Sequence, residues 1–334
     1  MEYESVTHTV TDRRLGRLPS GSEITVPVHR YVGGAGPTVY VQAAQHGIEL
    51  NGPAALRRLH ERLVEAELAG TVATVPVANP RAFDNRSYLT PAEFDARNPN
   101  LNRVWPGDED GTLQERLAAR LWPLAAGADA AVDLHTGTAD MLEHVRFREG
   151  ETGARRLATA FDTGYLLADG DLDSDDSDED GPAGTAADGD DEETFRGTFR
   201  AAASREGIPA VTAELSNSRT VDRAAVGTGL EGVLNVLRER DLLRGEPTAT
   251  AEPTVLRKGD GSVEATESGL FELRSGLAVG DTVEAGERLG TVYDPATFER
   301  RETVSAAESG VVYSLAREAV VVAGERVAAT AEPV

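Results

Sequence analysis

Short apolar runs alternate with segments of helical periodicity along the first three quarters of the chain. The apolar runs cover residues 38–44, 71–78, 128–133 and 209–215. The helical segments are one that starts near Pro53 and those at residues 113–124 and 221–244. Continuous apolar runs of this length are typical of strands that are buried on both faces, so the pattern predicts an α/β sheet sandwiched between helices. Residues 1–35 predict edge strands, and residues 80–112 predict a long ordered loop.

The composition and the periodicity of the sequence change near residue 247. Residues 247–253 read as a linker, and short β-rich pieces separated by glycine follow them. We therefore predict an α/β domain over residues 1–246 and a small all-β barrel domain over residues 247–334. The glycine turns resemble those of biotinyl or lipoyl carrier barrels. Those carriers modify a lysine, and no lysine follows Lys258, so a structural or shielding role is the better interpretation.

Acidic residues dominate the charge, with 33 Lys+Arg against 57 Asp+Glu and a net charge of −24. This excess opposes binding to nucleic acid or to an anionic membrane. Lys258 is the only lysine, and arginine in place of lysine predicts a halophilic protein in a high-salt cytoplasm; a GC-rich genome is the alternative. Neither a secretory signal nor an apolar run near the ~18 residues of a membrane span is present. The sequence is compatible with a homo-oligomer as well as with a monomer.

The most acidic segment covers residues 169–193. It is of low complexity and lacks the register of a calcium-binding loop, so we expect a solvated, disordered insertion. The chain has no cysteine, which excludes disulfides, thiol nucleophiles and iron–sulfur clusters. Any metal must therefore be held by His, Asp or Glu.

Two histidines stand at the ends of apolar runs. His46 follows the first run and His135 follows the third, while Glu49 lies three residues after His46. In open α/β sheets, ligands bind in the crevice beyond the carboxyl ends of the strands. Two imidazoles and one carboxylate can bind zinc and leave a fourth position open for water. Asp133 could hydrogen-bond His135 on the side away from the metal, or it could pair with a nearby arginine. An ordinary polar turn is the alternative interpretation.

Two further motifs could take part in chemistry. Asn102 and Arg103 are adjacent in the long loop, and an amide beside a guanidinium suits the binding of a carboxylate. The alternative is an arginine paired with one of the many acidic side chains. Glu214 closes an apolar run, where a partly desolvated carboxylate would be suited to moving a proton. The alternative there is a strand-end glutamate that faces solvent or an arginine.

In combination, these motifs resemble the succinylglutamate desuccinylase/aspartoacylase family. The resemblance covers about residues 35–240 and is carried by the segments Gln-His-Gly-Ile-Glu at 45–49, Asn-Pro at 79–80, Asn-Leu-Asn-Arg-Val-Trp-Pro-Gly at 100–107, Asp-Leu-His-Thr-Gly at 133–137, and Glu214. It implies a mixed-sheet, zinc-carboxypeptidase-like α/β sandwich, and the C-terminal barrel resembles the β domain that follows in this family.

The resemblance also implies a zinc hydrolase that cleaves the amide between an acyl group and an amino acid, with one Zn²⁺ per chain. The implied roles are zinc ligands for His46, Glu49 and His135, a substrate-carboxylate clamp for Asn102 and Arg103, and general base and then acid for Glu214. Arg86 is our choice for the arginine that polarises the scissile carbonyl, with Arg81 and Arg97 as competitors. The family's usual Asp before Leu-Asn-Arg is Asn100 here, which concerns a local hydrogen bond rather than the clamp.

Three functions fit this pattern. The first is a deacylase of a small N-acyl amino acid, for which N-acetyl-diaminobutyrate would suit a salt-adapted organism that handles compatible solutes. The second is a zinc carboxypeptidase or esterase acting on a larger substrate, which a barrel that narrows the site would disfavour. The third is a non-catalytic binding protein on the same scaffold, against which the intact candidate ligands and Glu214 argue.

Overall fold

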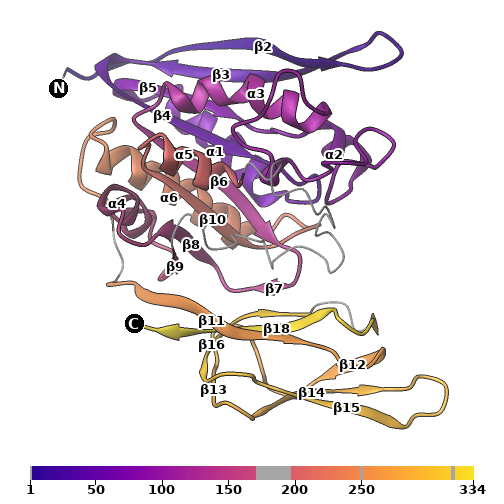
Figure 1. Cartoon of the computed structure of the whole chain (residues 1–334). Helices are drawn as coiled ribbons and strands as arrows, with labels where there is room; N and C mark the ends of the chain where they lie inside the picture. The colour runs from indigo at the N-terminus through magenta and orange to yellow at the C-terminus, as the bar shows by residue number, and fades with distance from the viewer. Residues whose placement is uncertain (1, 171–196, 249–250, 317–319) are drawn as a thin grey trace.

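The structure is a computed structural model that describes residues 2–170, 197–248, 251–316 and 320–334. A 14-stranded mixed sheet runs through the described part of the chain in the order β13-β16-β18-β11-β9-β8-β10-β6-β4-β5-β3-β2, with β1 paired to β5 and β7 to β16 (Figure 1). Its strands are β1 (Glu4–Ser5), β2 (Thr7–Arg17), β3 (Glu23–Val32), β4 (Gly34–Ala43), β5 (Glu67–Val75), β6 (Ala130–Gly137), β7 (Asp140–Met141), β8 (His144–Arg148), β9 (Tyr165–Asp169), β10 (Ala210–Asn217), β11 (Thr254–Glu264), β13 (Thr282–Val283), β16 (Gly310–Leu315) and β18 (Arg326–Pro333).

Helices cover both faces of the α/β part of this sheet. They are α1 (Asn51–Leu63), α2 (Pro80–Asn85), the 3-10 helix η1 (Leu101–Arg103), α3 (Leu113–Ala126), α4 (Thr152–Phe161), α5 (Phe199–Arg205) and α6 (Arg223–Glu239). Leucine, valine and phenylalanine side chains of α1, α4 and α6 pack in one core against the sheet. Side chains of α3 and α5, together with Leu101 and Trp105, pack in a second core on the opposite face. This is the α/β sandwich that the alternating pattern predicts.

The middle of the sheet is parallel. Strands β5, β4, β6 and β10 pair side by side in the same direction, whereas β8 runs antiparallel to β10, and β3 and β2 complete the opposite edge as antiparallel strands. The carboxyl ends of β4, β6 and β10 therefore meet at one edge of the sheet. Residues from the turn after β4 and from the ends of β6 and β10 can contact one another there.

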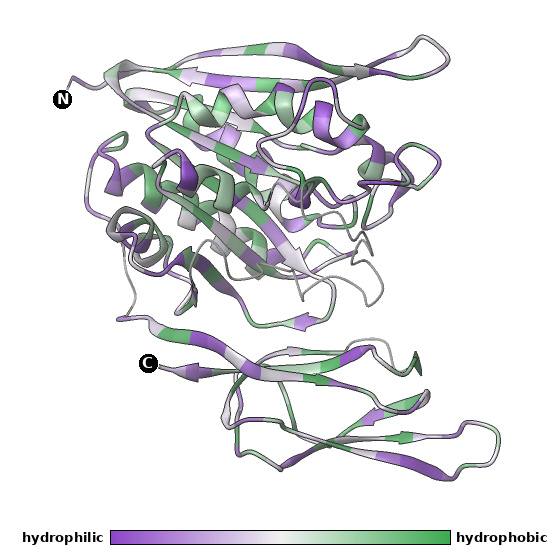
Figure 2. Cartoon of the chain, in the orientation of Figure 1, coloured by the Kyte–Doolittle hydropathy of each residue, from purple (hydrophilic) through white to green (hydrophobic). Residues whose placement is uncertain are grey.

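The two faces of the central strands differ in chemistry, because successive side chains of a strand point to opposite faces. In β6, Val132 and Leu134 belong to the core with α1, α4 and α6, while Asp133 and His135 alternate with them in sequence and point the other way. Polar residues are thus gathered on one face of β6, and Figure 2 shows similar changes of hydropathy along several strands.

Most predicted elements are confirmed, with shifted ends. The predicted strand at 128–133 continues as β6 to Gly137, so His135 lies inside the strand. Residues 80–112, predicted as a loop, contain α2 and η1. The start of α2 has a local sequence signal, because Asn79 accepts a hydrogen bond from the Ala82 amide and Pro80 occupies the first turn.

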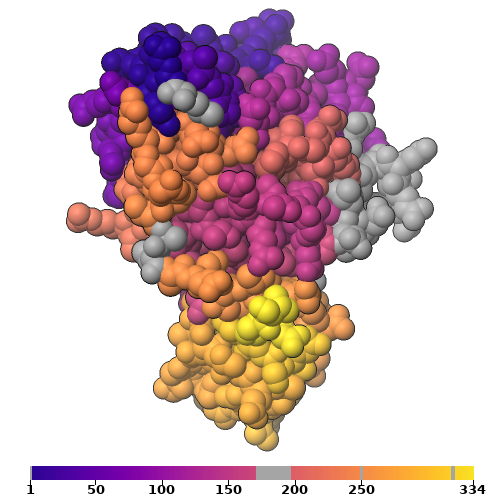
Figure 3. Space-filling model, turned by 90° about the vertical axis from the view of Figure 1, so that its left-hand side faces the viewer, coloured from indigo at the N-terminus to yellow at the C-terminus, as the bar shows by residue number. Residues whose placement is uncertain are grey.

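The C-terminal strands form two sheets, and a closed barrel is not confirmed. Strands β12 (Gly269–Leu273), β14 (Arg288–Tyr293), β15 (Arg300–Ser305) and β17 (Val320–Val321) make a separate four-stranded sheet in the order β15-β14-β12-β17. The remaining C-terminal strands continue the large sheet through a parallel pairing of β11 with β9. Figure 3 shows this part as a narrower projection from the α/β part.

The acidic segment begins later than predicted. Asp169 is the last residue of β9 and only 6% exposed, and it forms ion pairs with Arg146 (3.0 Å) and Arg200. The interpretation of this residue as part of a solvated insertion is therefore wrong, because two buried guanidinium groups compensate its charge. The rest of the insertion, from residue 171 on, lies outside the described residues. Among the residues that are described, no helix is long and apolar enough to cross a membrane.

Candidate functional site

His46, Glu49 and His135 come together at the carboxyl edge of the sheet, and we call them the His–Glu–His group. His46 and Glu49 lie in the turn between β4 and α1, and His135 lies near the end of β6. One ligand atom from each of the three lies within 4.8 Å of the others, and all three side chains are buried. His46 Nδ1 is 2.7 Å from Glu49 Oε1, and His135 Nδ1 is 3.2 Å from Glu49 Oε2.

The second nitrogen of each imidazole faces another oxygen. His46 Nε2 is 3.1 Å from Asn100 Oδ1, and His135 Nε2 is 2.9 Å from Asp133 Oδ2. An imidazole that donates its Nε2 proton to such an oxygen keeps the Nδ1 lone pair for a metal ion. Both rings thus direct Nδ1 at the Glu49 carboxylate, and the contact of each Nε2 with an oxygen holds the ring in this orientation. The proposed support of His135 by Asp133 matches this contact.

The electrostatics of the group favour a bound cation. Burial by itself would raise the pKa of Glu49, but the charges of His46 and His135 outweigh it and the pKa is lowered. Burial would likewise lower the pKa of His135, but Asp133 and Glu49 outweigh it and the pKa is raised well above its usual value. Glu49 Oε2 is buried and receives no well-directed hydrogen bond from the described residues. A buried carboxylate oxygen facing two imidazole nitrogens is a donor set that fits zinc.

Gln45 connects the group to its surroundings, and the sequence reasoning did not single it out. Its Nε2 donates to Asp133 Oδ2 at 2.5 Å, and its Oε1 accepts a hydrogen bond of 2.7 Å from Trp105 Nε1. Gln45 precedes His46 at a strand end, which is a signal that could have drawn attention to it. Tyr88 was also missed, and its ring stacks on His46 with centroids 4.1 Å apart.

The segment at residues 100–103 packs beside the group. Asn102 is buried, and its Oδ1 accepts hydrogen bonds from the Phe199 amide (2.9 Å) and Gln45 Nε2 (3.3 Å). Asn100 Oδ1 accepts from the Asn102 amide at 2.9 Å. The amide side chain thus makes the local hydrogen bond that the change from Asp to Asn called into question. Arg103 is half-buried, and its Nη1 donates to the Asn102 carbonyl at 2.9 Å.

Glu214 lies next to His135 across two parallel strands. It is 6% exposed, and β10 pairs with β6 so that Glu214 is directly opposite His135. Residues in register on neighbouring strands present their side chains on the same face of the sheet. Glu214 therefore belongs to the polar face that carries Asp133 and His135.

The structure does not bring Arg86 into the group. This residue ends α2 with a left-handed backbone (φ 52°), its side chain is exposed, and among the described residues it makes no hydrogen bond to the His–Glu–His group. Of its competitors, Arg81 pairs with Asp84 at 2.6 Å and Arg97 is exposed. The choice among these three arginines stays a prediction.

Fold and site together define a class: a mixed-sheet α/β protein with a buried His–Glu–His group, able to bind a metal, at the carboxyl edge of its parallel strands. The model of the succinylglutamate desuccinylase/aspartoacylase catalytic domain matches residues 35–240. The chain therefore belongs to the succinylglutamate desuccinylase/aspartoacylase family.

Individual relatives agree with this assignment. The N-α-acetyl-L-2,4-diaminobutyric acid deacetylase of Halomonas elongata is 30% identical over 283 residues, which cover 81% of this chain and 75% of the relative. Two solved structures are 25% identical with a TM-score of 0.81, and each comparison covers 99% of this chain and 96% of the other. They are a succinylglutamate desuccinylase/aspartoacylase from Rhodobacter sphaeroides and the product-bound ectoine utilization protein EutE (DoeB) from Ruegeria pomeroyi.

Proposed function

We propose that this protein is a zinc-dependent deacylase that hydrolyses the amide bond of a small N-acyl amino acid. The observation that carries the proposal is the arrangement of the His–Glu–His group, in which both imidazoles direct Nδ1 at one buried carboxylate. Membership of a family of deacylases supports the reaction type.

His46, Glu49 and His135 would hold the ion. Bound Zn²⁺ would supply a Lewis acid that polarises the scissile carbonyl and lowers the pKa of a water molecule towards ~7. Asn100 and Asp133 would keep the two imidazoles in the tautomer and orientation that the ligand role needs.

Glu214 is the proposed proton carrier. Its carboxylate takes a proton from the water as the oxygen attacks the carbonyl carbon, and then gives that proton to the amide nitrogen as the C–N bond breaks. The products are the free carboxylic acid and the free amine of the amino acid. Its position in register with His135 supports this role, because both side chains extend from the same face of the sheet.

Binding and orientation fall to the loop residues. Arg103 and Asn102 are the proposed clamp for the α-carboxylate of the substrate, since a guanidinium and an amide can bind its two oxygens together. The buried, hydrogen-bonded position of Asn102 would fix the clamp relative to the His–Glu–His group. Arg86 is the proposed arginine that stabilises negative charge on the carbonyl oxygen, which requires its exposed side chain to fold inward over the substrate.

For the substrate, we propose N-α-acetyl-L-2,4-diaminobutyrate first. The support is the deacetylase of Halomonas elongata, which is named for that compound and matches four fifths of this chain. A carboxypeptidase or esterase that acts on a larger substrate is the second candidate. The compounds to be tested therefore include peptides and esters.

The test measures free amine released from N-acetyl-2,4-diaminobutyrate, N-acetylaspartate and N-succinylglutamate, with peptides and esters in parallel, at low and high salt. We expect zinc-dependent release from at least one N-acyl amino acid, loss of release after chelation, and one bound zinc ion fewer per chain in His46→Ala than in the unchanged chain. Faster turnover of peptides or esters would favour the second candidate. Unchanged release from the chelated protein, or full zinc content in His46→Ala, would reject the proposed metal chemistry.

A further inference from the structure

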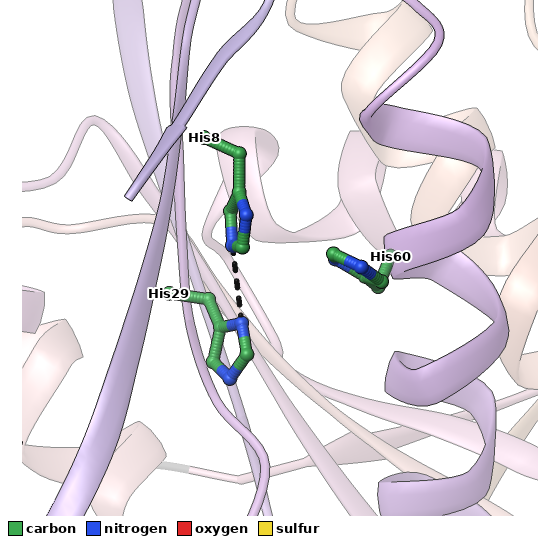
Figure 4. Close-up of side chains that lie close together, drawn as sticks. All are labelled: His8, His29 and His60. Atoms are coloured by element: carbon green, nitrogen blue, oxygen red, sulfur yellow. Dashed lines mark hydrogen bonds between the residues drawn. The ribbon is translucent and has the colours of Figure 1, made fainter. Parts of the chain in front are cut away.

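Three of the six histidines meet at a second place, away from the His–Glu–His group. His8 lies on β2, His29 on β3 and His60 on α1, and Figure 4 shows the three rings turned toward one another. One ring nitrogen from each lies within 4.8 Å of the others. We call these residues the three-histidine cluster. The proposed deacylation does not use them.

The cluster is built on regular secondary structure. In the antiparallel ladder of β2 and β3, His8 lies opposite Tyr31 and Val10 lies opposite His29, so both histidines face the same side of the sheet. Tyr31 on that side belongs to the core that includes Leu59 and Leu63 of α1. The last turn of α1, which carries His60, is therefore held against the ladder by apolar packing, and the three imidazoles need no mobile loop to meet.

The spacing of the rings suits a shared ion. A tetrahedral zinc ion bound at about 2.0–2.1 Å by each nitrogen holds two ligand nitrogens about 3.3–3.4 Å apart. His8 Nε2 and His29 Nδ1 are already 3.2 Å apart. His60 completes the set with its ring centroid 4.9 Å from that of His8. All three ligand nitrogens lie within 4.8 Å of one another, so the third needs to approach by no more than about 1.5 Å to reach the same spacing.

The surroundings favour neutral imidazoles whose lone pairs are available. Burial first, and then the neighbouring histidines, lower the pKa of both His8 and His29. Tyr31 Oη is 3.0 Å from His60 Nδ1, and burial raises the pKa of Tyr31 to about 12. A neutral phenol can accept the Nδ1 proton of His60, which leaves Nε2 of that ring as a ligand, as outer hydrogen bonds do in histidine metal sites.

We propose that His8, His29 and His60 form a second metal site, which takes a divalent transition-metal ion of the zinc type with water in the fourth position. Three imidazoles with one open position are an established zinc ligand set. All three residues are only partly buried, which gives the ion a path and leaves space for the water. Strand β2 is the outermost strand at its end of the large sheet. The bound ion would therefore link the edge strands β2 and β3 to α1.

The experiment counts bound Zn²⁺ per folded chain after metal removal and equilibrium dialysis, and follows the melting temperature with and without Zn²⁺. The background is His46→Ala, which removes a ligand of the first group. In that background we expect one ion per chain and a melting temperature that rises with Zn²⁺. Adding His29→Gln, or His60→Gln as a second variant, should reduce the count to zero and abolish the rise. Thr9→Gln, a neighbouring exposed position on β2, is the matched control and should keep both.

The outcomes separate the two metal sites. If the proposed deacylase chemistry failed but this site were real, the unchanged chain would bind one ion and lose it through His29→Gln alone. A count of zero in the His46→Ala background, or a count that neither His29→Gln nor His60→Gln reduces, would overturn the second site. The three rings would then be a packing cluster only.

Discussion

Replacing Glu214 by glutamine should remove proton transfer while leaving the fold and the metal group intact. The side chain is buried beside His135, and glutamine has nearly the same volume, so packing is preserved. An amide does not take the proton of the attacking water. General acid–base catalysis contributes about 10²- to 10⁴-fold to rate, which corresponds to about 2.7–5.5 kcal/mol of barrier. We expect kcat to fall by that factor with little change in bound zinc.

Glu143 is the matched control for this experiment. Burial raises the pKa of Glu143, and its Oε2 accepts a hydrogen bond of 3.0 Å from Thr228 Oγ1, so it is a second carboxylate with the properties of a base. Amine release, zinc content and melting temperature are measured for Glu214→Gln and Glu143→Gln side by side. The reasoning is refuted if Glu214→Gln keeps wild-type kcat, or if Glu143→Gln alone loses activity with its fold intact.

Two other predictions follow from the described contacts. Asp169→Asn should destabilise the protein by about 3–5 kcal/mol in urea unfolding, because it leaves the buried Arg146 and Arg200 without their counter-charge. Burial alone would raise the pKa of Asp169, but the two guanidiniums outweigh burial and lower the pKa. The stability that Asp169 contributes is therefore complete above the unfolded pKa near ~3.9, and it is lost as pH falls through the lower folded pKa. An acid-unfolding profile of Asp169→Asn that matches the wild type would contradict this. Arg86→Ala should lower kcat by roughly 10²- to 10³-fold with a smaller change in KM. Arg97, which is also exposed, is the control, and Arg97→Ala should leave kcat unchanged. Equal kinetics for the two variants would remove Arg86 from the mechanism.

Local sequence pattern predicted the central strands and helices because hydrophobic periodicity reports which side chains a segment must bury. It also predicted that His46 and His135 meet at the carboxyl edge of β4 and β6, since the topology of a parallel sheet brings those ends together, although His135 lies inside β6 rather than after it. The identity of the family followed from several short motifs in order, and the comparison with known proteins confirms it. The division at residue 246, the zinc ion and the high-salt cytoplasm stay predictions.

Contacts between residues that are far apart in sequence could not be predicted from the sequence, because hydrogen-bond partners and strand register depend on how distant segments pack together. The parallel pairing of β11 with β9 joins the C-terminal strands to the large sheet, although the composition near residue 247 suggested a separate barrel. Asp169 looked like the start of an acidic tract, and only the folded chain brings Arg146 and Arg200 against it. The same holds for the three-histidine cluster, whose members are ordinary single histidines in sequence and become neighbours because an edge hairpin and a helix pack on one core.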